Sequence, residues 1–207
     1  MLLKKALEPF HLILASQSPR RQDILTQMGL VFETRVRSVE EDYPDHLQGK
    51  EIPIFLAELK ASAFEGDLQV QDILITSDTI VWCDGEALGK PKDVNDAKHL
   101  LRKLSGTMHE VFTAVCLKTT TQISTVVDVT KVYFNPISDQ HIEQYIHECK
   151  PFDKAGAYGV QDWMGLVAVN RIEGSFYNVM GFPSHLVHKE LEKIAATLNP
   201  KQQFYEV

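Results

Sequence analysis

The sequence lacks the features that mark nucleic-acid-binding, membrane and secreted proteins. Its formal net charge is −7, whereas a general binder of nucleic acid or of a membrane surface needs a basic face. The apolar stretch near the N-terminus, residues 12–15, is too short for a signal peptide or a membrane span. Only three cysteines are present and they form no Cys-x-x-Cys pair, which favours a reduced, cytoplasmic setting.

Several catalytic signatures are also missing. The sequence contains no Gly-x-x-x-x-Gly-Lys-[Ser/Thr] loop, no Gly-x-Gly-x-x-Gly fingerprint, no His-Glu-x-x-His pair and no Gly-x-Ser-x-Gly elbow. Covalent catalysis therefore has no good candidate nucleophile, and zinc has no recognisable set of ligands.

What is present is the composition of a globular protein. The 207 residues are 44% hydrophobic and 24% charged, which suits one compact domain over residues 1–207 or two closely joined lobes. Strand-like and helix-like segments alternate, which predicts a mixed α/β sheet. The predicted strands are 12–15, 32–37, 73–82, 111–118 and 123–134, with a hairpin over 167–171 and 175–179. The predicted helices are 20–28, 53–64, the segment between Asp93 and Gly106, 138–147 and 183–198.

The segment at residues 16–21 reads Ser-Gln-Ser-Pro-Arg-Arg and directly follows the first predicted strand. Ser18 is a favourable helix N-cap, and Pro19 suits the first helical position. A strand that leads into a helix N-terminus presents free N–H groups and the positive end of the helix dipole. Arg20 and Arg21 oppose that dipole, so an anion with several oxygens, such as a phosphate chain, explains them better than helix stability does.

Two carboxylates are candidates for chemistry. Asp78 lies between the apolar runs 73–75 and 80–82, where a carboxylate is costly without a partner or a function. A solvated Asp at a strand edge or bulge is an equally good interpretation. Glu41, in the acidic run 40–42, would supply a second carboxylate for a hard cation such as Mg²⁺, although such a run is usually just solvated.

Three lysines could complete an anion site. Lys60 falls one turn after Leu56, at the margin of an apolar helix side, where most lysines extend to solvent. Lys90 stands between Gly89 and Pro91, which constrain its backbone. Lys154 precedes a Gly-rich loop that permits close approach of a ligand. Together, the cations, the acidic clusters and the helix N-terminus fit metal-assisted attack of water on a phosphate chain.

A series of short motifs occurs in the order seen in the Maf family. They are Ser-x-Ser-Pro-Arg-Arg at 16–21, Ser-Asp-Thr-Ile-Val at 77–81, Gly-Lys-Pro at 89–91, Leu-Ser-Gly at 104–106 with His109, Lys-Ala-Gly-Ala-Tyr-Gly-Val-Gln at 154–161, Glu-Gly-Ser at 173–175 with Asn178, and Gly-Phe-Pro at 181–183. Over about residues 10–195, the chain resembles a Maf-family protein.

The resemblance implies a nucleoside triphosphate pyrophosphatase that uses a divalent metal, Mg²⁺ or Mn²⁺. It implies an α/β fold like that of inosine triphosphate pyrophosphatases: an elongated, mixed, bent sheet flanked by helices, with a cleft between two lobes. The expected partner is a small nucleotide substrate, with no nucleic acid and no membrane, and a homodimer is possible.

The resemblance also implies residue roles. Asp78 matches the proton acceptor, and Glu41 matches the acidic residue near the metal, which Asp78 would share. The residues that match the phosphate-binding set are Ser18, Arg20, Arg21, Lys60 and Lys90, and Lys154 is a further substrate-binding candidate. The residues that match positions tied to substrate choice in the dTTP/UTP subfamily are Arg20, Thr79 and Gln161.

Three functions are therefore open. The sequence around Gln161 resembles the dTTP/UTP subfamily more than the 7-methyl-GTP subfamily, in which this loop reads differently. The resemblance has a physical basis, since an amide offers a donor and an acceptor to a pyrimidine edge. A pyrophosphatase for 7-methyl-GTP or another modified nucleotide is the alternative enzyme, and a nucleotide-binding regulator of cell division is the alternative of another class.

The chain departs from the usual family pattern at three positions. Residue 77 is Ser where Ala is common, and Asp162 and Trp163 follow Gln161 where the family often has Gly. Trp163 would stack on a base or cap the pocket.

Overall fold

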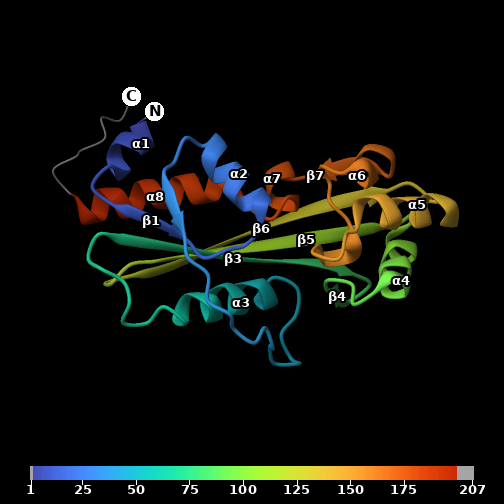
Figure 1. Ribbon diagram of the computed structural model, residues 1–207, viewed down its shortest axis with the longest axis horizontal. Helices are drawn as coiled ribbons and strands as arrows, with labels where there is room; N and C mark the ends of the chain where they lie inside the picture. The colour runs from blue at the N-terminus through green and yellow to red at the C-terminus, as the bar shows by residue number, and fades with distance from the viewer. Residues whose placement is uncertain (1, 200–207) are drawn as a thin grey trace.

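A computed structural model describes residues 2–199, and one sheet runs along its length (Figure 1). In this part of the chain seven strands pair in the order β2-β1-β3-β5-β6-β7, with β4 paired to β3. The pairs β1–β2 and β1–β3 are parallel, and the others are antiparallel. The strands are β1 His11–Leu14, β2 Phe32–Thr34, β3 Asp72–Cys83, β4 Glu86–Leu88, β5 Met108–Lys118, β6 Ile123–Phe134 and β7 Val169–Glu173. The predicted mixed α/β class is confirmed.

Helices cover both faces of the sheet and divide the core into parts. At one end, α1, α2 and α8 pack on one face and α3 packs on the other (Figure 1). At the other end, α4, α5 and the segment from η1 to α6 enclose a separate apolar cluster. The helices are α1 Leu2–Leu7, α2 Pro19–Gln27, α3 Glu51–Ser62, α4 Val94–Leu104, α5 Asp139–Cys149, η1 Ala155–Ala157, α6 Trp163–Val167, α7 Phe176–Val179 and α8 Ser184–Leu198.

Two predicted helix starts are confirmed by their capping bonds. The Asp93 side chain accepts a hydrogen bond from the Asp96 N–H at 2.9 Å, and the Ser138 hydroxyl accepts one from the His141 N–H at 3.3 Å. Each bond satisfies a backbone donor that the first helical turn leaves free. Helix α4 ends just before Gly106, whose φ of +70° suits glycine at a helix C-terminus.

The predicted hairpin after residue 167 is wrong in its second half. Residues 169–173 form β7, but residues 176–179 form helix α7. The Ser175 hydroxyl accepts from the Asn178 N–H at 3.3 Å, so a capped helical turn takes the place of the expected strand. The β-rich composition of this short segment concealed the cap.

Several boundaries also differ from the predictions. The second strand ends at Thr34 rather than at residue 37, and the helix predicted from Pro53 begins at Glu51. Ser18 occupies the N-cap position of α2, as predicted, but its side chain makes no capping hydrogen bond. The short elements α1, β4 and α6 were not predicted, because segments of three to six residues carry little periodic signal.

A gap along one edge of β3 determines where a ligand can reach the sheet. β1 pairs with β3 only as far as Ile75, and β4 begins to pair with it at Val81. Between these points, residues 76–80 pair with β5 on one side. Their other edge is reached by side chains and by solvent instead of by a strand.

His109 packs against the apolar cluster that α4, α5 and the segment from η1 to α6 enclose. It is 1% exposed, its ring packs edge-on against Phe134 and Tyr158, and its Nε2 lies 2.7 Å from the Tyr158 hydroxyl. Among the described residues, its Nδ1 has no hydrogen-bond partner. Burial lowers the pKa of His109 from 6.5 to about 4, so the ring is neutral at pH 7.

This buried histidine should make the fold sensitive to acid. Between pH 6.5 and about pH 4 the unfolded chain binds a proton that the folded chain excludes. The contribution of neutral His109 to the free energy of unfolding is therefore fully present above pH 6.5. It falls by about 2 kcal/mol on going from pH 8 to pH 5. Urea unfolding at both pH values should show this loss in the wild type and a smaller loss in His109→Phe. The exposed His147→Phe is the control, and equal pH dependence in all three proteins would contradict the assignment.

Candidate active site

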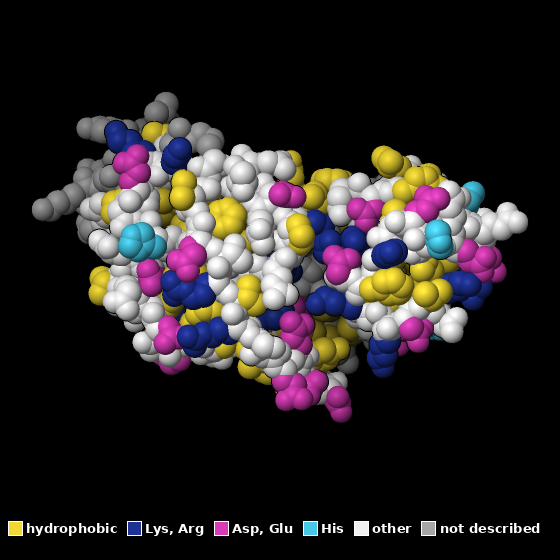
Figure 2. Space-filling view, viewed as in Figure 1, with side chains coloured by type: hydrophobic (Ala, Val, Ile, Leu, Met, Phe, Trp, Pro, Cys, Tyr) yellow, Lys and Arg dark blue, Asp and Glu magenta, His cyan; other side chains and the backbone are white. Residues whose placement is uncertain are grey.

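A cavity of about 970 Å³ opens at the free edge of β3, between the two ends of the molecule. Figure 2 shows Lys and Arg side chains gathered around a hollow in the middle of the visible face. The cavity brings together every site residue that the sequence predicted. These residues are Ser18, Arg20, Arg21, Glu41, Lys60, Asp78, Thr79, Lys90, Lys154 and Gln161.

Lys60 joins two carboxylates at the floor of this cavity. Its Nζ donates to Asp78 Oδ1 at 2.6 Å and lies 3.0 Å from Glu41 Oε1. Lys60 comes from α3, which packs on β3, and the Thr76 hydroxyl donates to the Ala57 carbonyl at 2.6 Å to tie the helix to the strand. The lysine therefore faces the strand that carries Asp78 and does not extend to solvent.

The two carboxyl groups differ in acidity. Asp78 is 8% exposed, and burial raises its pKa above the ordinary value of 3.8, although Lys60 and Arg21 hold part of that rise back. Partial burial also opposes the ionisation of Glu41. The positive charges nearby have the larger effect, however, so the pKa of Glu41 is lowered; they come from Lys60, Lys90 and Arg21. Asp78 is therefore the better proton acceptor of the two, and Glu41 keeps its charge more firmly.

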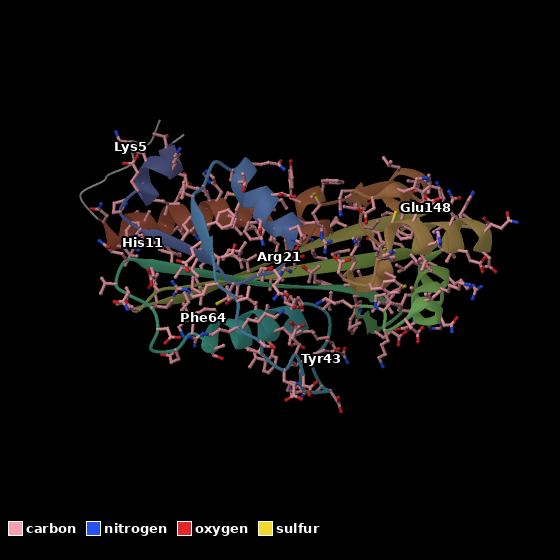
Figure 3. The ribbon with its side chains drawn as sticks, in the orientation of Figure 1. Lys5, His11, Arg21, Tyr43, Phe64 and Glu148 are labelled. Atoms are coloured by element: carbon pink, nitrogen blue, oxygen red, sulfur yellow. The ribbon has the colours of Figure 1, made fainter. Side chains whose placement is uncertain are left out.

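Arg21 holds the edge of β3 in place. Its guanidinium donates to the Gly181 carbonyl at 2.9 Å and to the Ser77 carbonyl at 2.9 Å. It also donates to the Ser16 hydroxyl at 3.2 Å and the Thr79 hydroxyl at 3.1 Å. Four of the five N–H donors of an arginine are thus directed at protein acceptors, and Figure 3 places Arg21 where α2 meets the sheet.

Burial lowers the pKa of Arg21 from 12.5 to about 10, so this side chain remains a cation at neutral pH. Its contacts suit a residue that positions the site and supplies a fixed positive charge. The sequence-based role of Arg21 as a direct phosphate ligand stays a prediction.

The opposite wall of the cavity carries a second group of charges. Asp153 accepts from Arg20 at 3.0 Å and from Lys154 at 2.8 Å, so it holds both cations at the cavity. The Gln161 amide donates to Asp162 at 3.0 Å. Asp153 was missed in the sequence because a charged residue in a loop is usually solvated; its place directly before Lys154 was the only available signal.

Trp163 does not line the cavity. Its ring stacks against Tyr145, with centroids 6.4 Å apart, and meets His141 edge-on at 5.7 Å. The expectation that Trp163 stacks on a base or caps the pocket is therefore wrong, because α5 provides an aromatic partner for it.

The donor set is compatible with a hard divalent cation. Within residues 2–199 there is no cluster of three or more His, Cys, Asp or Glu side chains suited to a metal, but Glu41 and Asp78 share one ammonium group. Mg²⁺ is commonly bound by one or two carboxylates together with substrate phosphates and water. These two residues fit that arrangement.

A sequence model of the family described as Maf-like protein matches residues 11–194. This chain belongs to the Maf family. The resemblance seen in the motifs is thereby confirmed over nearly the whole sequence.

Maf relatives with curated names agree with one another. The dTTP/UTP pyrophosphatase of Flavobacterium johnsoniae is 52% identical and covers 92% of this chain and 98% of its own length. The dTTP/UTP pyrophosphatase of Flavobacterium psychrophilum is 49% identical over 90% of this chain and 96% of its own. That of Phocaeicola vulgatus is 44% identical over 91% and 98%.

Two solved structures are more distantly similar. The Staphylococcus aureus Ham1 protein aligns with 89% of this Maf chain and 99% of its own, at a TM-score of 0.48 and 15% identity. A nucleoside-triphosphatase, dITP/XTP pyrophosphatase, from Mycobacterium abscessus aligns with 94% of this chain and 100% of its own, at a TM-score of 0.44 and 15% identity. The α/β class of this chain is assigned from the strand order and pairing of its own sheet and not from these two structures.

No helix in the described range is long and apolar enough to cross a bilayer.

The acidity of Asp78 should depend on Lys60. In Lys60→Met the carboxyl stays buried but loses its closest positive charge, so its pKa should rise further above 3.8. NMR titration of the Asp78 carboxyl carbon measures this directly. Lys98→Met is the matched control, because it removes a lysine that pairs with Glu143 at 2.7 Å on the outer helices. An unchanged Asp78 titration in Lys60→Met would contradict the electrostatic account.

Proposed function

We propose that this Maf-family enzyme hydrolyses dTTP and UTP to the nucleoside monophosphate and pyrophosphate. The observation that carries the proposal is the buried Asp78 carboxylate, held by Lys60 beside Glu41 in a cavity lined with cations. The names of relatives that are 44–52% identical support the choice of these two nucleotides.

The proposed reaction begins with water held by Asp78. The carboxylate takes a proton as the water oxygen bonds to the α-phosphorus, and the bond from that phosphorus to the oxygen bridging to the β-phosphorus breaks. Pyrophosphate leaves, and the proton on Asp78 returns to solvent. Burial keeps Asp78 basic enough for this task, while Lys60 keeps the carboxylate ionised and oriented.

The cations of the cavity bind the phosphate chain in this proposal. Lys90, Arg20 and Lys154 line the cavity from three different segments, and positive groups fixed around developing negative charge lower the barrier. Ser18 stands at the N-terminus of α2, where backbone N–H groups favour an anion. When held by Glu41, Asp78 and the substrate phosphates, Mg²⁺ or Mn²⁺ supplies further positive charge.

Substrate choice is assigned to the wall around Gln161. Its amide, together with Thr79 and Arg20, lines the cavity, and an amide can match both a donor and an acceptor on a pyrimidine. We also infer a cytoplasmic location and no nucleic-acid partner, supported by the free cysteines of the described chain and the net charge of −7. A homodimer stays a prediction.

A nucleotide panel tests the proposed function. Purified enzyme with Mg²⁺ or Mn²⁺ is given dTTP, UTP, CTP and 7-methyl-GTP, and both the monophosphate and pyrophosphate are measured. The highest kcat/KM is expected with dTTP and UTP, and a chelator should abolish turnover until the metal is restored. A preference for 7-methyl-GTP would defeat the choice of pyrimidines, and nucleotide binding without pyrophosphate release would favour a regulator.

A further inference from the structure

We propose that the buried Thr113 fixes the hydroxyl direction of Thr79, so that Thr79 meets the substrate only as a hydrogen-bond acceptor. Thr113 would then be a positioning residue for substrate selection, although it does not itself line the cavity. This inference rests on the proposed nucleotide pyrophosphatase function.

The two threonines are directly opposite each other in the sheet. Thr79 of β3 pairs with Thr113 of β5, and their hydroxyl oxygens are 3.0 Å apart. Thr113 is fully buried, whereas Thr79 is partly exposed and lines the cavity. One member of the pair can therefore contact a ligand, and the other connects it to the core.

The partners of these hydroxyls determine where each proton points. The Thr113 oxygen lies 2.9 Å from the backbone carbonyl of Asn178, which can only accept. Because a threonine hydroxyl has a single proton, the Thr113 proton is used on that carbonyl. Thr79 must then donate its own proton to Thr113, and it also accepts from the Arg21 guanidinium at 3.1 Å.

The carbonyl that orients Thr113 is itself firmly held. Asn178 is fully buried, and its amide donates to the Val111 carbonyl at 3.0 Å and to the Thr130 hydroxyl at 2.9 Å. The same Asn178 carbonyl also accepts from the Gly181 N–H at 2.9 Å. The hydrogen bonds from Thr79 to Thr113 and from Thr113 to Asn178 therefore run in one direction. If Thr113 donated to Thr79 instead, its oxygen and the Asn178 carbonyl oxygen would face each other as two acceptors with no proton between them.

Thr79 is left with one lone pair for a ligand. Phosphate oxygens are acceptors, so they do not match it. The matching donors on dTTP and UTP are the imide N–H of the base and the hydroxyl groups of the sugar. The ring nitrogen of cytosine at the position of that imide carries no hydrogen, so an acceptor-only Thr79 would favour UTP over CTP.

The test uses the isosteric variant Thr113→Val, which removes the acceptor for the Thr79 proton and frees that hydroxyl to rotate. Two ratios of kcat/KM are measured: UTP over CTP, and dTTP over 2′,3′-dideoxy-TTP. In Thr113→Val, one of these two ratios should fall about tenfold. Thr113→Ser keeps the hydroxyl, so both of its ratios should stay at the wild-type values. The ratio that falls tells whether the donor is the base imide or the sugar hydroxyl. Thr119→Val, a buried threonine beyond the end of β5, is the matched control and should change neither ratio.

Two outcomes would overturn the inference. One is that both ratios stay at their wild-type values in folded Thr113→Val, even if turnover falls uniformly. The other is that both stay unchanged in Thr79→Val, a partly exposed site that provides the test should the Thr113 variant fail to fold. Pyrophosphate release by the wild type from dTTP and UTP is recorded separately, so a failure of the proposed function is distinguished from a failure of this inference.

Discussion

The Lys60 ammonium group, shared between the carboxylates of Asp78 and Glu41, is the contact on which the active site depends. A buried carboxylate without a partner is costly, and here Lys60 of α3, which packs on the face of β3 that carries Asp78, supplies the partner. The pair is not simply a stabilising salt bridge, because burying two charges offsets much of their attraction. Its more important effect is to keep a buried Asp78 ionised and pointed at the cavity, where it can take a proton.

The gap in the sheet explains why the site lies where it does. On this edge of β3, β1 pairs only as far as Ile75, and β4 begins to pair only at Val81. The strand edge between them has no neighbouring strand, so its backbone groups need other partners. Arg21 occupies part of this edge by binding the Ser77 carbonyl, and the cavity occupies the rest. One arginine therefore completes the sheet and contributes charge to the site.

Sequence patterns predicted the elements whose signals are local. The long strands of the meander, the amphipathic α4 with its Asp93 cap and the C-terminal helix all carry clear periodicity or capping residues. The helix α7 was missed because its β-rich composition concealed the Ser175 cap. The hydrogen bonds of its buried Asn178 go to distant partners, which no local pattern reveals.

The site residues were predicted through motifs, but their contacts were not. A short motif identified Asp78, and Lys60 was singled out by its position on a predicted helix and by the family resemblance, yet only the packing of α3 on β3 shows that the two touch. In the same way, the loop residue Asp153 gains its role by accepting from Arg20 of α2 and from Lys154, two cations far apart in the sequence. Pairings across long stretches of sequence depend on tertiary geometry, so they become visible only in the structure.

The most direct measurement of the central claim is the turnover of Asp78→Asn. Because the amide cannot take a proton from water, kcat for dTTP should fall by roughly two to four orders of magnitude, with circular dichroism and thermal unfolding showing an intact fold. Asp72→Asn is the control, since it changes a buried aspartate on the same strand that does not line the cavity. Near-wild-type turnover in a folded Asp78→Asn would contradict the account.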